Sequence, residues 1–241
     1  MSVALMPLPQ LTALHDQFLS LSRIGHEHFA ELLGGKLLLR SGFGPEGIAV
    51  VIASSVAGAA SLCVDADGES LREGLRSGLI DFVVANLDEA LRILKNEIRR
   101  ARPVSVGLTA DPEPTIAEMI DRGLQPDLLS ALPQHQAVIL LERGALNLPP
   151  RLSSDAALLT WTVAENPAQS LPRIAAIAAE SLDPAREDTT ARRRWLEQSQ
   201  RYLGRAFGPH QVLRMSESEI AAFLPRLHTE IPSAKITRRG D

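Results

Sequence analysis

The sequence has few aromatic residues: six Phe, two Trp and one Tyr among 241 residues. A core of this chain must therefore be built from Ala, Val, Ile and Leu, as in layered α/β proteins whose buried parallel strands are short aliphatic runs. The same scarcity argues against an antibody-like sandwich and against an aromatic stacking platform for single-stranded nucleic acid. With 45% hydrophobic and 22% charged residues, the composition is typical of a folded globular protein.

Cysteine is nearly absent as well, since Cys63 is the only one. A single cysteine excludes an intramolecular disulfide and every zinc site that uses several cysteines, and it fits a reducing compartment. The segment Met1–Gln10 lacks the basic and apolar stretches of a signal peptide. We therefore expect a cytoplasmic protein in which Cys63 packs as a small hydrophobic side chain.

Neither a positive net charge nor a long apolar run is present. The formal net charge is −4, so we expect no nucleic acid and no anionic membrane among the partners. The most apolar window, Ile48–Val64, contains three serines and a glycine and is too short and polar to span a bilayer. We interpret the one basic cluster, Ala191–Trp195 (ARRRW), as a solvated helix face because Glu197 is close to it.

No residue pattern identifies a metal site or a catalytic centre. His26 and His28 are two positions apart and point away from each other on a helix, so they cannot chelate an ion together. The stretch Asp65–Glu69 (DADGE) lacks the later ligands of an EF-hand loop. A Gly-x-Ser-x-Gly elbow is also missing. We therefore expect no metal, and the catalytic residues remain unknown.

From residue 35 onward, short aliphatic runs alternate with helical segments. This alternation is typical of βαβ units and predicts a doubly wound, mostly parallel, Rossmann-like α/β sheet. The predicted strands are Lys36–Arg40, Ser61–Val64, Ile80–Val84, Pro103–Leu108 and Asp127–Ser130, and the helices between them are Glu46–Ala60, Glu69–Ser77, Leu87–Arg100 and Pro112–Arg122.

The two ends of the chain are predicted to be helical additions. We expect a single α/β domain over residues 1–241, with an N-terminal helical segment (1–34), a core (35–165) and a mainly helical C-terminal part (166–241). Residues 137–142 (AVILLE) and 157–163 (ALLTWTV) are predicted as further strands, the segments 171–181, 189–206 and 216–227 as helices, and 235–241 as a frayed end.

A glycine-rich segment follows the first predicted strand of the core. It reads Gly42-Phe43-Gly44-Pro45-Glu46-Gly47 and opens a helix, and the next strand ends at Asp65, 23 residues after Gly42. In dinucleotide-binding folds such glycines admit the pyrophosphate to a helix N-terminus, and the later acid binds the ribose. The sequence leaves a second interpretation open, in which the glycines only permit a tight turn and Glu46 complements the helix dipole.

Polar residues after two later strands are further candidates for the same site. Asp111 and His135 follow predicted strands and could face the crevice at the carboxyl ends of the strands, where open α/β sheets bind ligands. The cofactor-binding candidates are thus Gly42, Gly44, Gly47, Asp65 and Asp111.

Five consecutive blocks of the chain follow a pattern known from one family. They are Gly35–Gly47 (GKLLLRSGFGPEG), Ala57–Asp65 (AGAASLCVD), Gly78–Leu91 (GLIDFVVANLDEAL), Val104–Leu108 (VSVGL) and Arg122–Asp127 (RGLQPD). Together they resemble the central NAD-binding domain of urocanase (urocanate hydratase), from Gly35 to Ser130. The resemblance implies NAD as cofactor, with the three glycines of the loop at its phosphates, Asp65 at a ribose, and a link to histidine metabolism.

The chain departs from this family at several positions. Pro45–Val50 (PEGIAV) replaces Gly-Met-Gly-Gly-Ala-Gln, Ser70 replaces an arginine, and Asp111-Pro112 replaces Asn-Ala. Leu132–Gln136 (LPQHQ) replaces Gln-Thr-Ser-Ala-His, and the catalytic cysteine has no counterpart. Only 34 residues precede the resemblance, so we also expect no equivalent of the family's upstream segment.

Three functions remain open at this stage. The first is a urocanase-like protein that binds a dinucleotide or another small molecule without classical urocanate hydratase activity. The second is an NAD-dependent lyase or hydratase acting on an imidazole-type substrate. The third is a structural subunit, such as a homo-oligomer, whose nucleotide site is plugged by Phe43 or Glu46.

Overall fold

The computed structural model describes residues 8–29, 33–148, 156–203 and 208–239. The chain divides into two compact units. We call Ser20–Pro150 the parallel-sheet unit, and Met1–Leu19 together with Arg151–Asp241 the antiparallel-sheet unit. These boundaries differ from the expected ones after residues 34 and 165.

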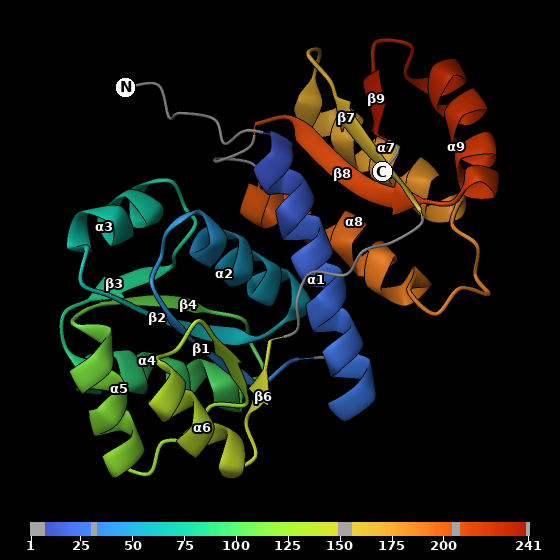
Figure 1. Ribbon diagram of the computed structural model, residues 1–241. Coiled ribbons are helices and arrows are strands. Elements are labelled where there is room, and N and C mark those ends of the chain that lie inside the picture. Colours follow the sequence, from blue (N-terminus) through green and yellow to red (C-terminus); the bar gives the residue numbers. More distant parts are fainter. Residues whose placement is uncertain (1–7, 30–32, 149–155, 204–207, 240–241) are drawn as a thin grey trace. The chain divides into compact units, whose positions relative to one another are not determined.

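The parallel-sheet unit has a six-stranded sheet in the order β3-β4-β2-β1-β5-β6 (Figure 1). Every neighbouring pair of strands is parallel, which confirms the predicted doubly wound Rossmann-like fold. The strands β2 to β4 lie on one side of β1, and the strands β5 and β6 lie on its other side. The carboxyl end of β1 is therefore the switch point where such sheets bind ligands. The strands are β1 (Leu37–Ser41), β2 (Ala60–Asp65), β3 (Phe82–Val84), β4 (Ser105–Thr109), β5 (Leu128–Ser130) and β6 (Leu146–Asn147).

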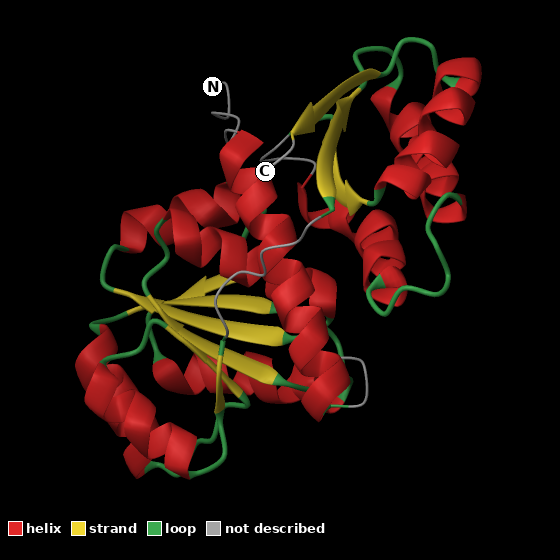
Figure 2. Cartoon of the chain, turned by 45° about the vertical axis from the view of Figure 1, so that its right-hand side comes forward, coloured by secondary structure: helices red, strands yellow, loops and turns green. Residues whose placement is uncertain are grey.

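Helices cover both faces of this sheet, as Figure 2 shows. One face carries the main aliphatic core, in which α4, α5 and α6 pack on the strands through Leu94, Ile116 and Leu140. On the other face, Gly107 of β4 has no side chain because α3 lies directly over it: a Cβ there would come within 2.9 Å of Leu71. The helices are α2 (Pro45–Ala57), α3 (Gly68–Arg76), α4 (Leu87–Arg99), α5 (Pro112–Asp121) and α6 (Gln134–Glu142).

Side-chain caps fix the start of three of these helices. Asp67, Asn86 and Asp111 each accept hydrogen bonds from backbone N–H groups of the following turn. Helix α2 differs, because its N-cap is Gly44 and no side chain caps it. The first turns of α2 and of α6, whose N-cap is Pro133, are therefore the ones without a side-chain cap among these five helices.

The antiparallel-sheet unit contains a three-stranded sheet in the order β8-β7-β9. Its helix α9 begins with a capping box, in which Ser216 and Glu219 bond each other's backbone. The strands are β7 (Ala157–Thr162), β8 (His210–Met215) and β9 (Lys235–Arg239), and the helices are α7 (Pro167–Glu180), α8 (Thr189–Leu203) and α9 (Glu217–Glu230). Helix α1 (Leu8–His28) contains the boundary between the two units.

Two predictions about the later part of the chain are wrong. The run 137–142 lies in α6 rather than in a strand, since an apolar run of six residues fits either element. The predicted frayed end contains β9, which pairs with β7. The part after residue 165 contains the helices α7, α8 and α9, and it also contains two strands that were not predicted, β8 and β9. The predicted end of one helix at residues 204–206 lies outside the described residues.

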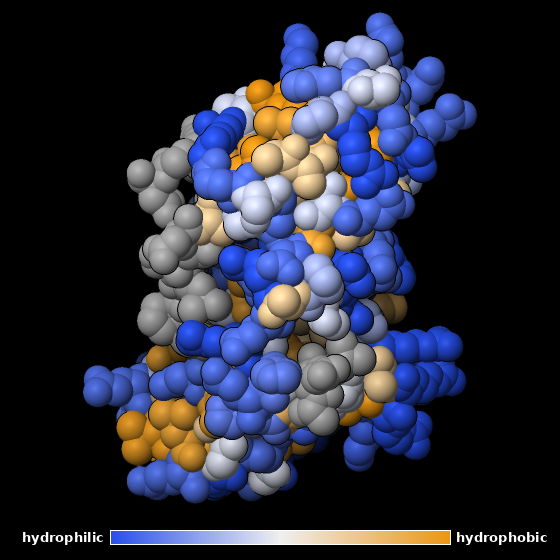
Figure 3. Space-filling model, turned by 90° about the vertical axis from the view of Figure 1, so that its right-hand side faces the viewer, coloured by the Kyte–Doolittle hydropathy of each residue, from blue (hydrophilic) through white to orange (hydrophobic). Residues whose placement is uncertain are grey.

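The surface is largely hydrophilic on the side drawn in Figure 3, where hydrophobic residues form separate small patches. Large apolar side chains that are exposed in the described chain are Leu75, Phe82, Val138 and Ile139. Among the described helices, none combines the length and the apolar character that crossing a bilayer requires.

Candidate functional site

The glycine loop lies between the carboxyl end of β1 and the first turn of α2. Gly42 adopts φ +81°, a left-handed conformation that favours glycine at this turn. Gly47 approaches the loop backbone so closely that a Cβ would lie 2.5 Å from the Gly42 carbonyl oxygen. These two glycines are thus required by the tight turn itself.

The outer side of the loop is open. A Cβ built on Gly42 or on Gly44 meets no described atom within 4 Å. Phe43 does not cover this space, because its ring is 1% exposed and faces α3, 2.6 Å from where a Cβ of Gly74 would lie. Glu46 is exposed. The described Phe43 side chain therefore does not plug the loop.

Asp65 holds the loop from the end of β2. One of its carboxylate oxygens accepts the Phe43 N–H at 2.6 Å, and the other accepts the Asp67 N–H at 2.8 Å. The residue is half-buried. A carboxylate offers about four acceptor positions, so each oxygen retains capacity for a further donor beside the loop.

Arg40, the last residue of the predicted strand Lys36–Arg40, lies beneath the loop. It is 7% exposed, and it donates from Nε to the Gly42 carbonyl (2.9 Å) and from Nη1 to the Ser130 hydroxyl (2.6 Å). No carboxylate of the described residues forms an ion pair with it. Burial lowers the pKa of its guanidinium. Arg40 thus links the ends of β1 and β5 and brings a buried positive charge to the switch point.

Arg40 is not among the candidates predicted from the sequence, which placed it within a strand. The available signal was its position: the last residues of a strand that precedes a glycine loop reach the carboxyl edge of the sheet.

Cys63 also lies under the loop, and its Sγ is 3.4 Å from the Gly42 carbonyl oxygen. The thiol is buried. Burial, opposed by the nearby Arg40, raises the pKa of Cys63 to about 12. Because only the thiolate is a strong nucleophile, this cysteine is unreactive in the folded chain.

The remaining two candidates lie farther along the same edge of the sheet. Asp111 caps α5 by accepting the Glu113 N–H, and it follows Thr109, which pairs in register with Asp65. His135 is the second residue of α6 and is 62% exposed, and its Nε2 lies 3.8 Å from a carboxylate oxygen of Glu113, two residues after Asp111. The structure therefore brings Asp65 and Asp111 to one edge and places His135 on the surface beside the first turn of α5.

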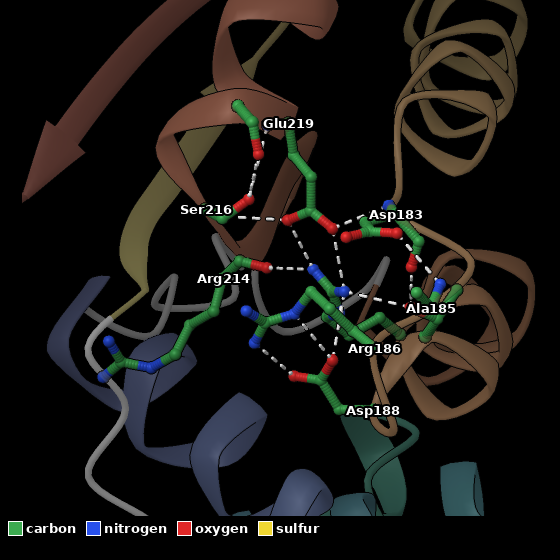
Figure 4. A network of polar contacts seen from close by, with 10 residues as sticks. Asp183, Ala185, Arg186, Asp188, Arg214, Ser216 and Glu219 are labelled. Atoms are coloured by element: carbon green, nitrogen blue, oxygen red, sulfur yellow. Dashed lines mark hydrogen bonds and ion pairs between the residues drawn. The ribbon is translucent and has the colours of Figure 1, made fainter.

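The basic cluster of the other unit is only partly solvated, which corrects the expectation for residues 191–195: Arg193 is exposed, but Arg192 is not. Arg192 is fully buried and donates from both terminal nitrogens to Glu219, at 2.8 and 2.9 Å. Figure 4 shows Glu219 surrounded by Ser216 and Asp183, whose backbone N–H groups also donate to it. Although burial opposes it, these donors lower the pKa of Glu219 to about 2. This cluster is an internal support of the unit.

No cluster of three or more potential metal ligands occurs in the part of the chain that the structure describes. His26 and His28 are exposed on α1. This part of the chain therefore provides no described ligand set from which a metal centre could be argued.

Comparison with known families identifies the origin of this architecture. A model of the urocanase Rossmann-like domain matches residues 13–138. The match starts before Gly35, so the likeness reaches farther toward the N-terminus than the sequence blocks indicated. Because the matched segment is more than half of the 241 residues and contains the glycine loop, the chain belongs to the urocanase family.

Proposed function

We propose that the parallel-sheet unit binds a dinucleotide, with NAD as the candidate, and that the chain lacks classical urocanate hydratase activity. The urocanase Rossmann-like domain is associated with NAD in its family. The observation that carries the proposal is the open outer side of Gly42 and Gly44, directly before the uncapped first turn of α2. The turn glycines Gly123 and Gly144 are equally unobstructed, so it is the position of this open space at a helix N-terminus that favours an anionic ligand.

The residues of the loop fit the phosphates. Gly42, Gly44 and Gly47 let the backbone approach a pyrophosphate closely, and the free N–H groups of the first turn of α2 attract negative charge. Pro45 removes one donor, but as the first residue of the helix its missing N–H is least costly there. The exposed Glu46 opposes an anion, and the buried Arg40 beneath the loop compensates for it.

Two carboxylates complete the proposed site. Asp65 would accept hydrogen bonds from the hydroxyls of a ribose with the capacity left after its two backbone bonds. Asp111 would line the neighbouring edge, beyond the end of β4. Asp65 thus positions the loop and contacts the ligand at once.

One group that the family's reaction requires has no counterpart in this chain. In urocanase, NAD acts as an electrophile to which the imidazole substrate adds. The family's catalytic cysteine has no counterpart in this chain, and Cys63 is buried with a pKa of about 12. We therefore infer binding of the dinucleotide without the hydration of urocanate.

Calorimetric titration of the full chain with NAD tests the proposal, with Gly44→Val as the variant. Gly44 has φ −49°, so valine is expected to fold there while its side chain occupies the space for the phosphates. We expect heat of binding with the wild type and a loss of affinity of at least about tenfold in the variant. Equal binding by both proteins, or no heat and no thermal shift at millimolar NAD, would overturn it.

A urocanate absorbance assay with added NAD tests the second half of the proposal. We expect an unchanged spectrum. Consumption of urocanate by the wild type, retained in Cys63→Ser, would instead reveal a hydratase with a rebuilt catalytic site.

A further inference from the structure

A groove of about 920 Å³ opens at the edge of the parallel sheet, beside the C-terminal half of α4. It is lined by Phe82 at the start of β3 and by Pro103 and Val104, which precede β4. Because all strands of this sheet are parallel, the amino ends of β3 and β4 lie at the opposite edge from the glycine loop. The groove is therefore separate from the proposed dinucleotide site.

The floor of the groove is apolar and uncovered. Phe82 shares a face of β3 with Val84, which belongs to the core under α4. Helix α4 itself packs mainly over β2 and β4, so it leaves the ring of Phe82 46% exposed. Layered folds bury such a face under a helix, and here the edge strand has none above Phe82.

The wall of the groove carries a stripe of cations. Arg92, Lys95 and Arg99 are all exposed and line the groove. Their spacing of three and four residues places them on one side of α4, over about 10 Å at 1.5 Å per residue. None of the three forms an ion pair with a described carboxylate.

Other helices of the unit neutralise their cations. On α3, Arg72 and Arg76 pair with glutamates of the same helix, and on α5 Arg122 pairs with Glu118. Both acids that line the groove have other partners: Asp81 accepts bonds from Ser105, and Glu97 lies 3.8 Å from Arg100. Three unneutralised cations therefore border an apolar floor in a chain whose net charge is −4.

We propose that this groove, defined by Phe82, Arg92, Lys95 and Arg99, binds an acidic amphipathic helix of a partner protein. An apolar helix face would cover Phe82, and acids one turn apart would meet the cations on α4. A second copy of this chain fits less well, because the two cation stripes would face each other in a symmetric pair. A nucleic acid fits less well because the floor is apolar and the chain is acidic.

Fluorescence anisotropy with a labelled peptide tests this proposal on the full chain. The probe is a helical peptide of about 18 residues, or five turns, with Leu along one face and Glu on both flanks. Its matched control carries Lys in place of every Glu. We expect the acidic peptide to bind the wild type with micromolar affinity and the lysine peptide to bind at least about tenfold more weakly.

Variants of the groove residues test where the acidic peptide binds. Arg92→Glu combined with Arg99→Glu should weaken the acidic peptide at least about tenfold, and Phe82→Ser should weaken it as well. Arg193→Glu with Arg201→Glu, which changes the charge equally on the exposed side of α8, should leave binding unchanged. Circular dichroism confirms that each variant is folded.

Several outcomes would overturn the proposal. They are the absence of binding at about 1 mM acidic peptide, equal binding by the α4 double variant, and equal binding of the lysine peptide. Preferential binding of a single-stranded RNA oligonucleotide would assign the groove to another class of partner. A failure of NAD binding would leave the groove unaffected, since the two sites lie at opposite edges of the sheet.

Discussion

Two buried arginines, Arg192 in the antiparallel-sheet unit and Arg40 in the parallel-sheet unit, are held in different ways. Arg192 is paired at both terminal nitrogens with the Glu219 carboxylate. Arg40 bonds only neutral acceptors among the described residues, the Gly42 carbonyl and the Ser130 hydroxyl. The first charge is paired directly with a buried carboxylate, whereas the second has the exposed Glu46 nearby but no ion pair with a described carboxylate.

This difference distinguishes charged side chains that stabilise the fold from one that is available to a ligand. In the antiparallel-sheet unit a second buried arginine, Arg214, is likewise bidentate to Asp16, at 2.7 and 3.0 Å. Burial of an unpaired charge is costly, so an arginine that lacks a carboxylate partner beside an open loop points to an anion supplied from outside. We interpret the two paired arginines as supports and Arg40 as part of the ligand site.

The largest expected effect comes from removing the two arginines in turn. Arg192→Met leaves the Glu219 carboxylate buried without its cation and should lower the free energy of unfolding by about 3–5 kcal/mol. Arg40→Met loses hydrogen bonds to neutral groups only, which costs about 1 kcal/mol. Amide hydrogen exchange measures the stability of each unit separately. An equal loss of stability in the two variants would remove the distinction between them.

Tryptophan fluorescence gives an independent measure of the first variant. The sequence has two tryptophans, and both Trp161 and Trp195 lie in the antiparallel-sheet unit. Urea unfolding followed by tryptophan fluorescence should therefore show the full decrease in the unfolding free energy of Arg192→Met. The control Glu217→Ala, which breaks only the exposed pair with Arg238, should change the unfolding free energy by less than about 1 kcal/mol.

A smaller effect is expected from adding one methyl group at two glycines of the loop. In Gly47→Ala the Cβ collides with the Gly42 carbonyl, and we expect a loss of about 1–3 kcal/mol from overpacking. In Gly44→Ala the same group enters open space, and the stability should change by less than about 0.5 kcal/mol. A strongly destabilised Gly44→Ala protein in thermal unfolding would show that the loop is closed.

The smallest effect concerns pH and the antiparallel-sheet unit. His15 is fully buried, neither ring nitrogen has a hydrogen-bond partner among the described residues, and the ring packs edge-on against Trp195. Burial lowers its pKa below the ordinary 6.5, with Arg214 and Arg192 acting in the same direction and Asp16 opposing them. The unfolded chain therefore binds a proton more readily, and stability should fall as the pH drops below 6.5.

Fluorescence-detected urea unfolding at several pH values measures this dependence. The slope is at most about 1.4 kcal/mol per pH unit for one proton, and it should disappear in His15→Phe. Glu219, with its pKa of about 2, loses its contribution only as the pH falls below 4.5. Between pH 6.5 and 5 the pH dependence of the unfolding free energy therefore reports His15 rather than Glu219. An unchanged slope in His15→Phe would contradict the assignment of this dependence to His15.

Local signals were sufficient to predict the parallel sheet. Aliphatic runs separated by helical segments identified β1 to β5, and the predicted helices Leu87–Arg100 and 216–227 begin within one residue of the observed starts of α4 and α9. The order of the strands could not be predicted, because β4 inserts between β2 and β3 through contacts distant in sequence.

The buried polar contacts were harder to predict because they too join residues that are distant in sequence. Arg192 was interpreted as part of a solvated face because Glu197 is close in sequence, whereas its actual partner Glu219 lies 27 residues away, on another helix. The loop glycines and Asp65 follow from sequence spacing, whereas Arg40 at the loop depends on the direction of its side chain at the end of β1. Three-dimensional contacts, not residue types, distinguish these two arginines.

Hydrogen exchange of the full chain with and without NAD tests the central claim most directly. We predict slower exchange for the amides between Gly42 and Ala49 and around Asp65, with no change in the antiparallel-sheet unit. The same amides should be unaffected in Gly44→Val. Unchanged exchange throughout the wild type at saturating NAD, or protection confined to the antiparallel-sheet unit, would contradict the account.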